Sequence, residues 1–554
     1  MNSRNFTDKF QPVFSGLLIC IVLLVATGLP VVAQENRADY DIVIRNGRVL
    51  DGAGNPWIAA DVAVKDGKFV KIGKIDGKGK REIDASGKYV TPGWIDMMDQ
   101  SGHVLPKNGL AENKVFMGVT TAIGGEGGTP VAADKITEYF AGLEKSGISI
   151  NFGSYFSETQ ARYAVLGMDS REPTAEELMR MKEIMELAMK SGAMGMTTAL
   201  IYPPSSFAKT PELIEMAKVA GRYGGIYASH MRDEGRGLVG AVEEAIEIGE
   251  KGGLPVEIFH LKAAYQPGWG KLMNEAGEKI KKARDRGVDV AADMYLYTAG
   301  GTGLEATIPS WAYEGGEKKL LERLKDPKIR TRLKKELKTG SPGWWNIVEA
   351  SGGWENVVLV NAQNKDNAKY EGKNLAQIAK EMKKDPADAA WDLVSQGNGR
   401  VLAIYHMMSE EDIITALKFP WTSIGSDAGA SLKPGTVDGL GLAHPRSYGN
   451  HPRLIAYYVR EKKVLTLPEA IRKMTSLPAA RMRLDSRGMI KEGLWADAVI
   501  FDYDKIQDRA TFEQPLLFPV GINYVLVNGE IVAIDGKHTG ARPGKVIYGP
   551  GRGM

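Results

Sequence analysis

The sequence predicts an α/β protein: a (β/α)8 TIM barrel with a small β-sandwich domain formed together by the N- and C-terminal segments. Short strands joined by Asn46-Gly47 and Asp66-Gly67 turns begin after residue 40, and similar strands return near the C-terminus. Between these ends, apolar strand candidates alternate with amphipathic helical stretches. This alternation is typical of a parallel barrel, and a doubly wound sheet is the alternative that the spacing leaves open.

The expected elements follow in chain order. We expect barrel strands at 89–98, 119–125, 148–155, 194–200, 225–232, 255–262, 288–297 and 421–427, with helices between them at 174–190, 211–223, 238–251 and 273–286. Two further helices, at 317–338 and 375–396, interrupt the alternation of strands and helices. The expected domains are a signal peptide at 1–33, the N-terminal part of the β-sandwich at 40–91, the barrel at 92–485 with an insertion at about 303–400, and the C-terminal part of the β-sandwich at 486–554.

The first 33 residues have the pattern of a signal peptide. Arg4 and Lys9 precede an apolar run that ends in small residues near Ala33. A membrane anchor is the competing interpretation, but the run is shorter than the roughly 20 residues of a full span. Cys20 lies inside this run, where bulky Ile19 disfavours a lipoprotein site. We therefore expect a periplasmic or secreted protein with no stable membrane anchor after cleavage.

Composition excludes several classes of chemistry. The single cysteine of the chain lies in the predicted signal peptide, so the mature protein has neither a disulfide framework nor a thiolate nucleophile. The chain carries 71 basic and 68 acidic residues, and this balance does not indicate a nucleic-acid partner. Catalysis must use histidine, carboxylate, lysine or hydroxyl groups.

Three residues occupy places where a parallel barrel gathers its catalytic groups. His230 and His260, two of only seven histidines, end consecutive predicted strands, and Asp427 ends the last one. Buried core histidines and a helix-capping aspartate are the alternative interpretations. Two histidines and a carboxylate with an open position suit a hydrolytic zinc site, in which Asp427 would be the general acid and base.

Several motifs together resemble the N-acyl-D-amino-acid deacylases (D-aminoacylases) of the amidohydrolase superfamily. The resemblance runs from about residue 40 to the C-terminus and is specific as a set. It is carried by Pro92-Gly-Trp-Ile-Asp96, Gly118-Val-Thr-Thr121, Ser229-His-Met-Arg-Asp-Glu234, Phe259-His-Leu-Lys262, Gly425-Ser-Asp427 and His444-Pro-Arg-Ser-Tyr-Gly449.

The resemblance implies roles for these residues. His230 and His260 match the family's paired metal histidines, and Asp427 matches its catalytic aspartate. The residues that match the expected grip on the free carboxylate of a small-molecule substrate are Lys262, Arg446 and a tyrosine, either Tyr295 or Tyr297. Surface ion pairs for the two cations and ordinary packing for the tyrosines are the alternatives.

The sequence departs from the family at the first strand. Such enzymes carry His-x-His after Pro-Gly-x-Ile-Asp, but here Met98 and Gln100 occupy those positions. Neither a thioether nor an amide readily replaces imidazole as a zinc ligand. Asp96, Asp99 or His103 could substitute, but we expect that the first metal site is lost.

A second departure concerns the bridging cysteine that the family typically has after Gly-Val-Thr-Thr. Gly127 stands in its place, and Glu126 precedes it in a glycine-rich stretch. A carboxylate at a strand end can turn inward, although a solvent-facing loop glutamate is the alternative. We expect a single Zn2+ on Glu126, His230 and His260, with water in the fourth position.

These features favour hydrolysis of the amide bond of N-acyl-D-amino acids or similar carboxylate-bearing amides. Fold does not fix the substrate. Hydrolysis of a dipeptide, a cyclic amide or a lactone on the same scaffold is one alternative. The other is a non-catalytic protein that kept the barrel after losing His-x-His.

Overall fold

Eight parallel strands form the predicted barrel in the computed structural model, which describes residues 38–397 and 400–554. The strands are β6 (Trp94–Asp99), β7 (Val119–Gly124), β8 (Asn151–Ser154) continued by β9 (Phe156–Ser157), β10 (Gly195–Ala199), β11 (Ile226–His230), β12 (Val256–Ile258), β13 (Val290–Met294) and β17 (Thr422–Ile424). They form two parallel sheets, β6-β7-β8 and β9-β10-β11-β12-β13-β17. Tyr155 alone separates β8 from β9, and a parallel bridge between Asp99 and Ala428 closes the ring.

Helices follow most of the barrel strands. They are α1 (Glu112–Phe116), α2 (Ile136–Ser146), α3 (Glu158–Leu166), α4 (Ala175–Lys190), α5 (Thr210–Arg222), α6 (Leu238–Gly252) and α7 (Leu272–Asp285). The boundaries follow capping chemistry: Thr174 and Glu177 form a capping box at the start of α4, and Gly253 ends α6 in the left-handed conformation. The four helices expected between strands are observed as α4 to α7.

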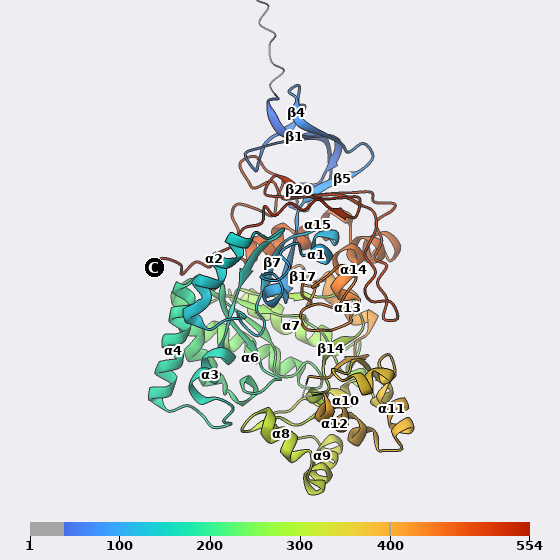
Figure 1. The fold of residues 1–554 in the computed structure, drawn as a ribbon. Helices are drawn as coiled ribbons and strands as arrows, with labels where there is room; N and C mark the ends of the chain where they lie inside the picture. Colours follow the sequence, from blue (N-terminus) through green and yellow to red (C-terminus); the bar gives the residue numbers. More distant parts are fainter. Residues whose placement is uncertain (1–37, 398–399) are drawn as a thin grey trace, which may run out of the picture. The chain divides into compact units, whose positions relative to one another are not determined.

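The segment between β13 and β17 adds a group of helices outside the barrel, and α8 to α12 lie at the bottom of Figure 1. It contains α8 (Glu317–Arg323), α9 (Pro327–Thr339), α10 (Ile347–Ala350), α11 (Leu375–Met382), α12 (Pro386–Gln396), α13 (Glu410–Lys418) and the antiparallel strands β14 (Gly300–Gly303), β15 (Val357–Asn361) and β16 (Leu402–Tyr405). The single helices expected at 317–338 and 375–396 are each two helices. Asp326-Pro327 and Asp385-Pro386 divide them, because each aspartate caps a new helix and each proline occupies its first turn.

Strands from both ends of the chain share one nine-stranded sheet, at the top of Figure 1. They are β1 (Tyr40–Val49), β2 (Ile58–Lys65), β3 (Lys68–Gly73), β4 (Gly79–Asp84), β5 (Tyr89–Pro92), β18 (Ala498–Phe501), β19 (Ile522–Val527), β20 (Glu530–Ile534) and β21 (Lys537–His538). Strand β5 pairs with β1 on one side and with β18 on the other, so it joins the two ends. Val62, Val90 and Ile500 belong to the apolar core beneath this sheet. The chain passes from β17 to β18 through α14 (Arg446–Arg453), the π-helical η9 (Leu454–Glu461), α15 (Leu467–Met474) and α16 (Ser476–Arg481).

One expected strand, 89–98, is divided between the two domains. The chain leaves the nine-stranded sheet at Pro92 and enters the barrel at Trp94. Gly93 lies between them, and a Cβ atom there would stand 2.1 Å from the hydroxyl of Thr120. Only glycine allows this close passage. Among the residues that the structure describes, no helix is long and apolar enough to cross a membrane, and the predicted signal peptide lies outside those residues.

Candidate metal centre and active site

A cavity of about 600 Å³ opens at the carboxyl ends of the barrel strands. Residues of the barrel and of the insertion both line it. The lining includes Glu126, His230, His260, Lys262, Tyr295, Asp427 and Arg446, together with insertion residues such as Thr302, Glu305 and Trp345. Catalytic groups in TIM barrels gather at this face, so the cavity is the candidate active site.

Glu126 reaches the cavity from the turn that follows β7. Gly125 begins this turn with a φ of +100°, and a Cβ atom there would lie 2.9 Å from the carbonyl oxygen of Tyr155. The amide of Gly128 donates to the carbonyl of Gly125 at 2.9 Å, which closes the turn. The glycines therefore fold the chain so that the carboxylate between them points inward, as expected from the sequence.

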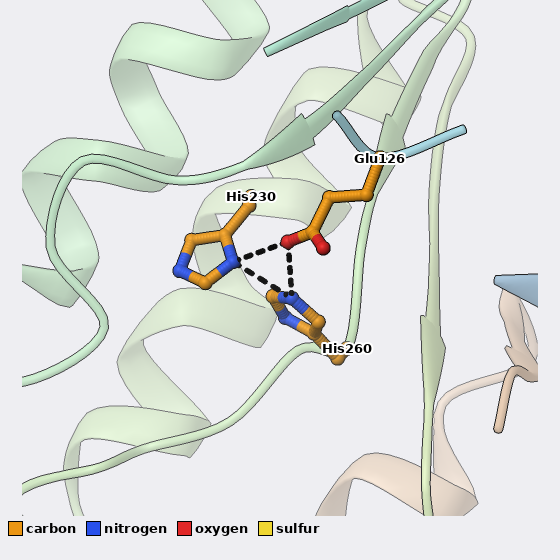
Figure 2. Close-up of side chains that lie close together, drawn as sticks. All are labelled: Glu126, His230 and His260. Atoms are coloured by element: carbon orange, nitrogen blue, oxygen red, sulfur yellow. Dashed lines mark hydrogen bonds and ion pairs between the residues drawn. The ribbon is translucent and has the colours of Figure 1, made fainter. Parts of the chain in front are cut away.

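The histidines converge on that carboxylate (Figure 2). His230 is the last residue of β11, and its Nδ1 lies 2.6 Å from Oε1 of Glu126. The Nε2 atom of His260 lies 3.0 Å from the same Nδ1 and 3.5 Å from the same Oε1. His260 has a φ of 36°, and its backbone amide donates to the Oδ1 of Asp293 at 2.9 Å. Asp293 thus stabilises a backbone conformation that non-glycine residues rarely adopt.

The donor set fits a metal ion. Glu126, His230 and His260 each offer one ligand atom, and these atoms lie within 4.8 Å of one another. Within residues 38–397 and 400–554, this is the one group of three or more such side chains that could hold a metal. Two imidazole nitrogens and one carboxylate oxygen form the type of ligand set that catalytic zinc sites use, with a fourth position left for water or substrate.

Glu234 contacts both histidines on the side away from Glu126, a role not expected from the sequence. Its Oε1 lies 3.0 Å from Nδ1 of His260, and its Oε2 lies 3.6 Å from Nε2 of His230. A proton on Nδ1 of His260 would be donated to Glu234 and would leave Nε2 free as a ligand. The sequence offered two signals, the interval of four residues between His230 and Glu234 and the place of Glu234 in the Ser229-His-Met-Arg-Asp-Glu234 motif. Neither specifies the turn after β11 that brings Glu234 to the histidines.

The charges of the centre shift the pKa values of its members. Burial acts to raise the pKa of Glu126, but hydrogen bonds with His230 and His260 hold it well below its usual range. Burial and Lys262 act to lower the pKa of His260, but Glu234 and Glu126 raise it to about 9. The two carboxylates therefore outweigh the positive charge of Lys262 around His260, and such an environment favours a cation.

The first strand supplies no second set of ligands. Met98 packs in an apolar cluster with Ile123 and Phe259, while the side-chain amide of Gln100 donates to Oε2 of Glu126 at 2.7 Å. Gln100 thus binds one carboxylate oxygen of Glu126, a candidate metal ligand. The other oxygen, Oε1, stays free to face the histidines.

The three residues considered as substitute ligands do not join the centre. Asp96 and Asp99 form buried ion pairs with Lys114, at 2.9 and 2.7 Å. His103 lies in a 3-10 turn at the cavity wall, largely exposed, and is not part of the ligand group. The loss of the first metal site stays a prediction.

Asp427 and Arg446 form an ion pair at the cavity wall. Oδ2 of Asp427 lies 2.7 Å from an Nη1 of Arg446, whose guanidinium lies over the ring of Tyr295 at 4.7 Å from the centroid. Among the described residues, Nε of Arg446 has no hydrogen-bond partner although it is buried. This leaves a donor for an anionic ligand. Asp427 itself has a φ of 49°, a left-handed conformation that costs about 1–3 kcal/mol and persists where neighbouring contacts offset this cost.

Lys262 and Tyr297 differ from the simplest expectation. The ammonium of Lys262 lines the cavity, but it contacts Oε1 of Glu234 at 2.6 Å and Nδ1 of His260 at 2.7 Å. It is therefore bound within the metal centre. Tyr295 lines the cavity, whereas Tyr297 is not part of the lining and packs against Phe512 beneath Arg453. Because β13 ends at Met294, the two tyrosines do not share a strand face.

Comparison with known proteins gives consistent results. A family model described as "Amidohydrolase family" matches residues 433–533. A D-aminoacylase of Alcaligenes xylosoxydans xylosoxydans is 31% identical over 93% of this chain and 99% of its own length. An N-acyl-D-glutamate deacylase of the same organism is 30% identical over 92% of this chain and 96% of its own.

Solved structures extend the similarity to the fold. A D-aminoacylase described by its binuclear metal centre, with one-metal activation and second-metal attenuation, has a TM-score of 0.77 and 30% identity and covers 92% of this chain and 99% of its own. An N-acyl-D-glutamate deacylase from Bordetella bronchiseptica, complexed with zinc and a phosphonate that mimics the tetrahedral intermediate, has a TM-score of 0.75 and 29% identity, with 92% and 99% coverage. A D-hydantoinase with 16% identity and a TM-score of 0.52 shares the fold.

Proposed function

This chain belongs to the D-aminoacylase family of metal-dependent amidohydrolases, and we propose that it hydrolyses the amide bond of N-acyl-D-amino acids to release a carboxylate and a free amino acid. The observation that carries this proposal is the shared cavity. The carboxylate and two imidazoles of the metal centre face the same space as the Asp427–Arg446 ion pair. A hydrolytic centre and a carboxylate-binding cation are the two parts that such a substrate requires.

The metal site is proposed to hold one zinc ion on Glu126, His230 and His260. Zinc would supply a Lewis acid for the scissile carbonyl and would lower the pKa of the attacking water. Two observations support a single ion: Met98 lies in the apolar cluster, and Gln100 occupies the second oxygen of Glu126. The D-aminoacylase described by one-metal activation is a precedent for hydrolysis with one metal.

Asp427 is the proposed general acid and base. Its Oδ2 is bound by Arg446, so Oδ1 is the atom that accepts a proton from water as the water oxygen bonds to the carbonyl carbon. Asp427 then returns this proton to the amine nitrogen as the C–N bond breaks. Glu234 holds the histidines in place throughout, because it contacts both rings on the side away from the ligand atoms.

Arg446 is the proposed anchor for the substrate's free carboxylate. Its buried Nε lacks a partner among residues 38–397 and 400–554, and a guanidinium binds a carboxylate through two parallel hydrogen bonds. Tyr295 supports the guanidinium from one face. Lys262 adds positive charge to the same cavity, although its contacts with Glu234 and His260 leave at most one N–H for a substrate.

A substrate panel with zinc-loaded protein tests the function. N-acyl-D-amino acids, their L-isomers and their methyl esters, with dipeptides, cyclic amides and lactones, should give turnover that is highest for the free D-acids. Replacing Arg446 by Met should raise KM for the free acids about 10- to 100-fold relative to the esters, as expected for a charge-assisted pair. Arg453→Met on the same helix is the matched control, because Arg453 pairs with Asp508 outside the cavity lining.

Contrary results would select among the alternatives. Equal losses for acids and esters would remove Arg446 as the carboxylate anchor. Turnover of cyclic amides or lactones alone would support another amidohydrolase activity. Absence of bound metal in the purified protein, together with no turnover of any compound, would support a non-catalytic role.

Export is proposed on the basis of the N-terminal sequence. Arg4 and Lys9 precede the apolar run, and small residues follow it near Ala33. N-terminal sequencing of protein from the periplasm or the medium should find a chain that begins near Gln34. A chain that retains Met1 in the membrane fraction would support an anchor instead.

A further inference from the structure

The backbone around Asp427 is held from several sides by buried groups. Its amide donates to the carbonyl of Met98 at 2.9 Å, and the amide of Gln100 donates to the carbonyl of Ala428 at 3.1 Å. The amide of Ser426 donates to Oδ1 of Asp96 at 2.8 Å. Both neighbours of Asp427 are therefore attached to the end of β6, and the left-handed conformation of Asp427 lies between these attachments.

Lys114 connects these contacts. This lysine belongs to α1, and its ammonium donates to the hydroxyl of Ser426 at 2.8 Å and to the carbonyl of Ala428. The same ammonium forms ion pairs with Asp96 and Asp99 at 2.9 and 2.7 Å, and all three charged side chains are fully buried. One atom thus holds the residue before Asp427, the residue after it, and the strand end to which both are bonded.

The charge of Lys114 is maintained despite its burial. Burial acts to lower its pKa, but Asp96 and Asp99 raise it above its usual value. Other titratable groups also face this cluster: burial lowers the pKa of His451 to about 4, so it stays neutral at pH 7, and burial raises the pKa of Asp293, near Asp96, and of Tyr139, near Asp99. Ordinary solution conditions therefore leave the ammonium charged and able to donate all of its hydrogen bonds.

We propose that Lys114 is the positioning residue for Asp427: it fixes the strained backbone that directs the carboxylate into the cavity. The inference rests on the proposed role of Asp427 in proton transfer. Lys114 does not line the cavity, so its effect on turnover passes through Ser426 and Ala428. A displacement of a catalytic group by about 1 Å can reduce the rate about 100-fold, which sets the expected size of the effect.

The test compares two buried lysines that hold opposite ends of β17. Lys114 contacts the residues that follow this strand, whereas Lys473 donates to the carbonyls of Phe419 and Thr422 at its start, at 2.6 and 3.0 Å. Lys114→Met should lower kcat about 100-fold with KM and zinc content unchanged, and should increase the solvent deuterium isotope effect on kcat, because proton transfer becomes slower. Lys473→Met should lower Tm but leave kcat and the isotope effect unchanged.

Equal losses of kcat in both variants, with an unchanged isotope effect, would overturn the inference, as would normal turnover by Lys114→Met. If Lys114→Met does not fold, Ser426→Ala takes its place, because it removes one contact without leaving buried charge; unchanged kcat in that variant overturns the inference. A crystal structure of the folded variant tests the positioning role of Lys114 independently of the proposed function. Asp427 should lose its positive φ and its contact with Arg446 whether or not a substrate is known, and retention of both would refute the inference.

Discussion

Replacing Gln100 by Ala should weaken zinc binding without removing any ligand. The side-chain amide of Gln100 donates to Oε2 of Glu126 at 2.7 Å, and this carboxylate also faces both histidines. A hydrogen bond to a charged group contributes about 1.5–3 kcal/mol. Because about 1.4 kcal/mol corresponds to a tenfold change in affinity, the Kd for zinc should rise about 10- to 150-fold. This range agrees with the losses of about 10- to 100-fold found when groups that orient metal ligands are removed.

The assay is competition between the protein and a chromogenic zinc chelator, followed by absorbance. Gln507→Ala is the matched control, because Gln507 accepts a hydrogen bond from Arg460 at 2.8 Å and does not line the cavity. The control should bind zinc as the unchanged protein does. A Kd for Gln100→Ala within about twofold of the control would refute the reasoning, since it would mean that Glu126 is oriented without the amide.

Two further predictions concern turnover and pH. Asp427→Asn should retain zinc and the contact with Arg446 but lower kcat about 100- to 10,000-fold, the contribution expected of a general acid and base. Metal analysis measures the zinc content, and steady-state kinetics measure kcat. A kcat within tenfold of the unchanged enzyme would exclude the role. Burial, with Glu212 nearby, raises the pKa of Glu158 from 4.5 to about 8. Between these two pH values the folded state binds a proton that the unfolded state has released. The stability of the protein therefore falls as pH rises from 4.5 to about 8. Glu158→Gln should therefore have a higher Tm relative to the unchanged protein at pH 9 than at pH 4, and parallel Tm curves across this range would contradict the assignment.

Much of the fold could be predicted from the periodicity of apolar residues and from the residues that begin and end helices and strands. The alternation of apolar strands with amphipathic helices predicted the order of the barrel elements, because short apolar runs and the helical spacing of apolar residues are distinct patterns in the sequence. One error concerns Asn46-Gly47, which lies inside β1 at a shift in its register with β2 and does not form the expected turn between strands. The other errors occurred where local chemistry divides a continuous pattern. Asp326-Pro327 and Asp385-Pro386 each end one helix and start another, and Gly93 carries one apolar run into two sheets.

The metal centre was predictable because its ligands end strands, but their supports were not. His230 and His260 occupy positions that barrel topology brings together, and the glycines around Glu126 indicated a turn. Glu234, Gln100 and Lys114 act through partners that only the three-dimensional arrangement defines. Lys114 is 312 positions from Ser426 in the chain, and no periodic pattern connects residues at such a separation.

The close passage at Gly93 also determines how the barrel is joined to the rest of the chain. The amide of Gly93, where the chain enters the barrel, donates to the carbonyl of Asp497, where the chain returns to the nine-stranded sheet, at 2.8 Å. The two junctions are thus adjacent, and no linker separates the domains at either point. The barrel has the topology of an inserted module whose ends meet. The chain after β21 returns to the barrel, where Gly544 and Val546 form bridges with Ile148 and Phe152, so truncation at the C-terminus would first remove contacts of the barrel itself.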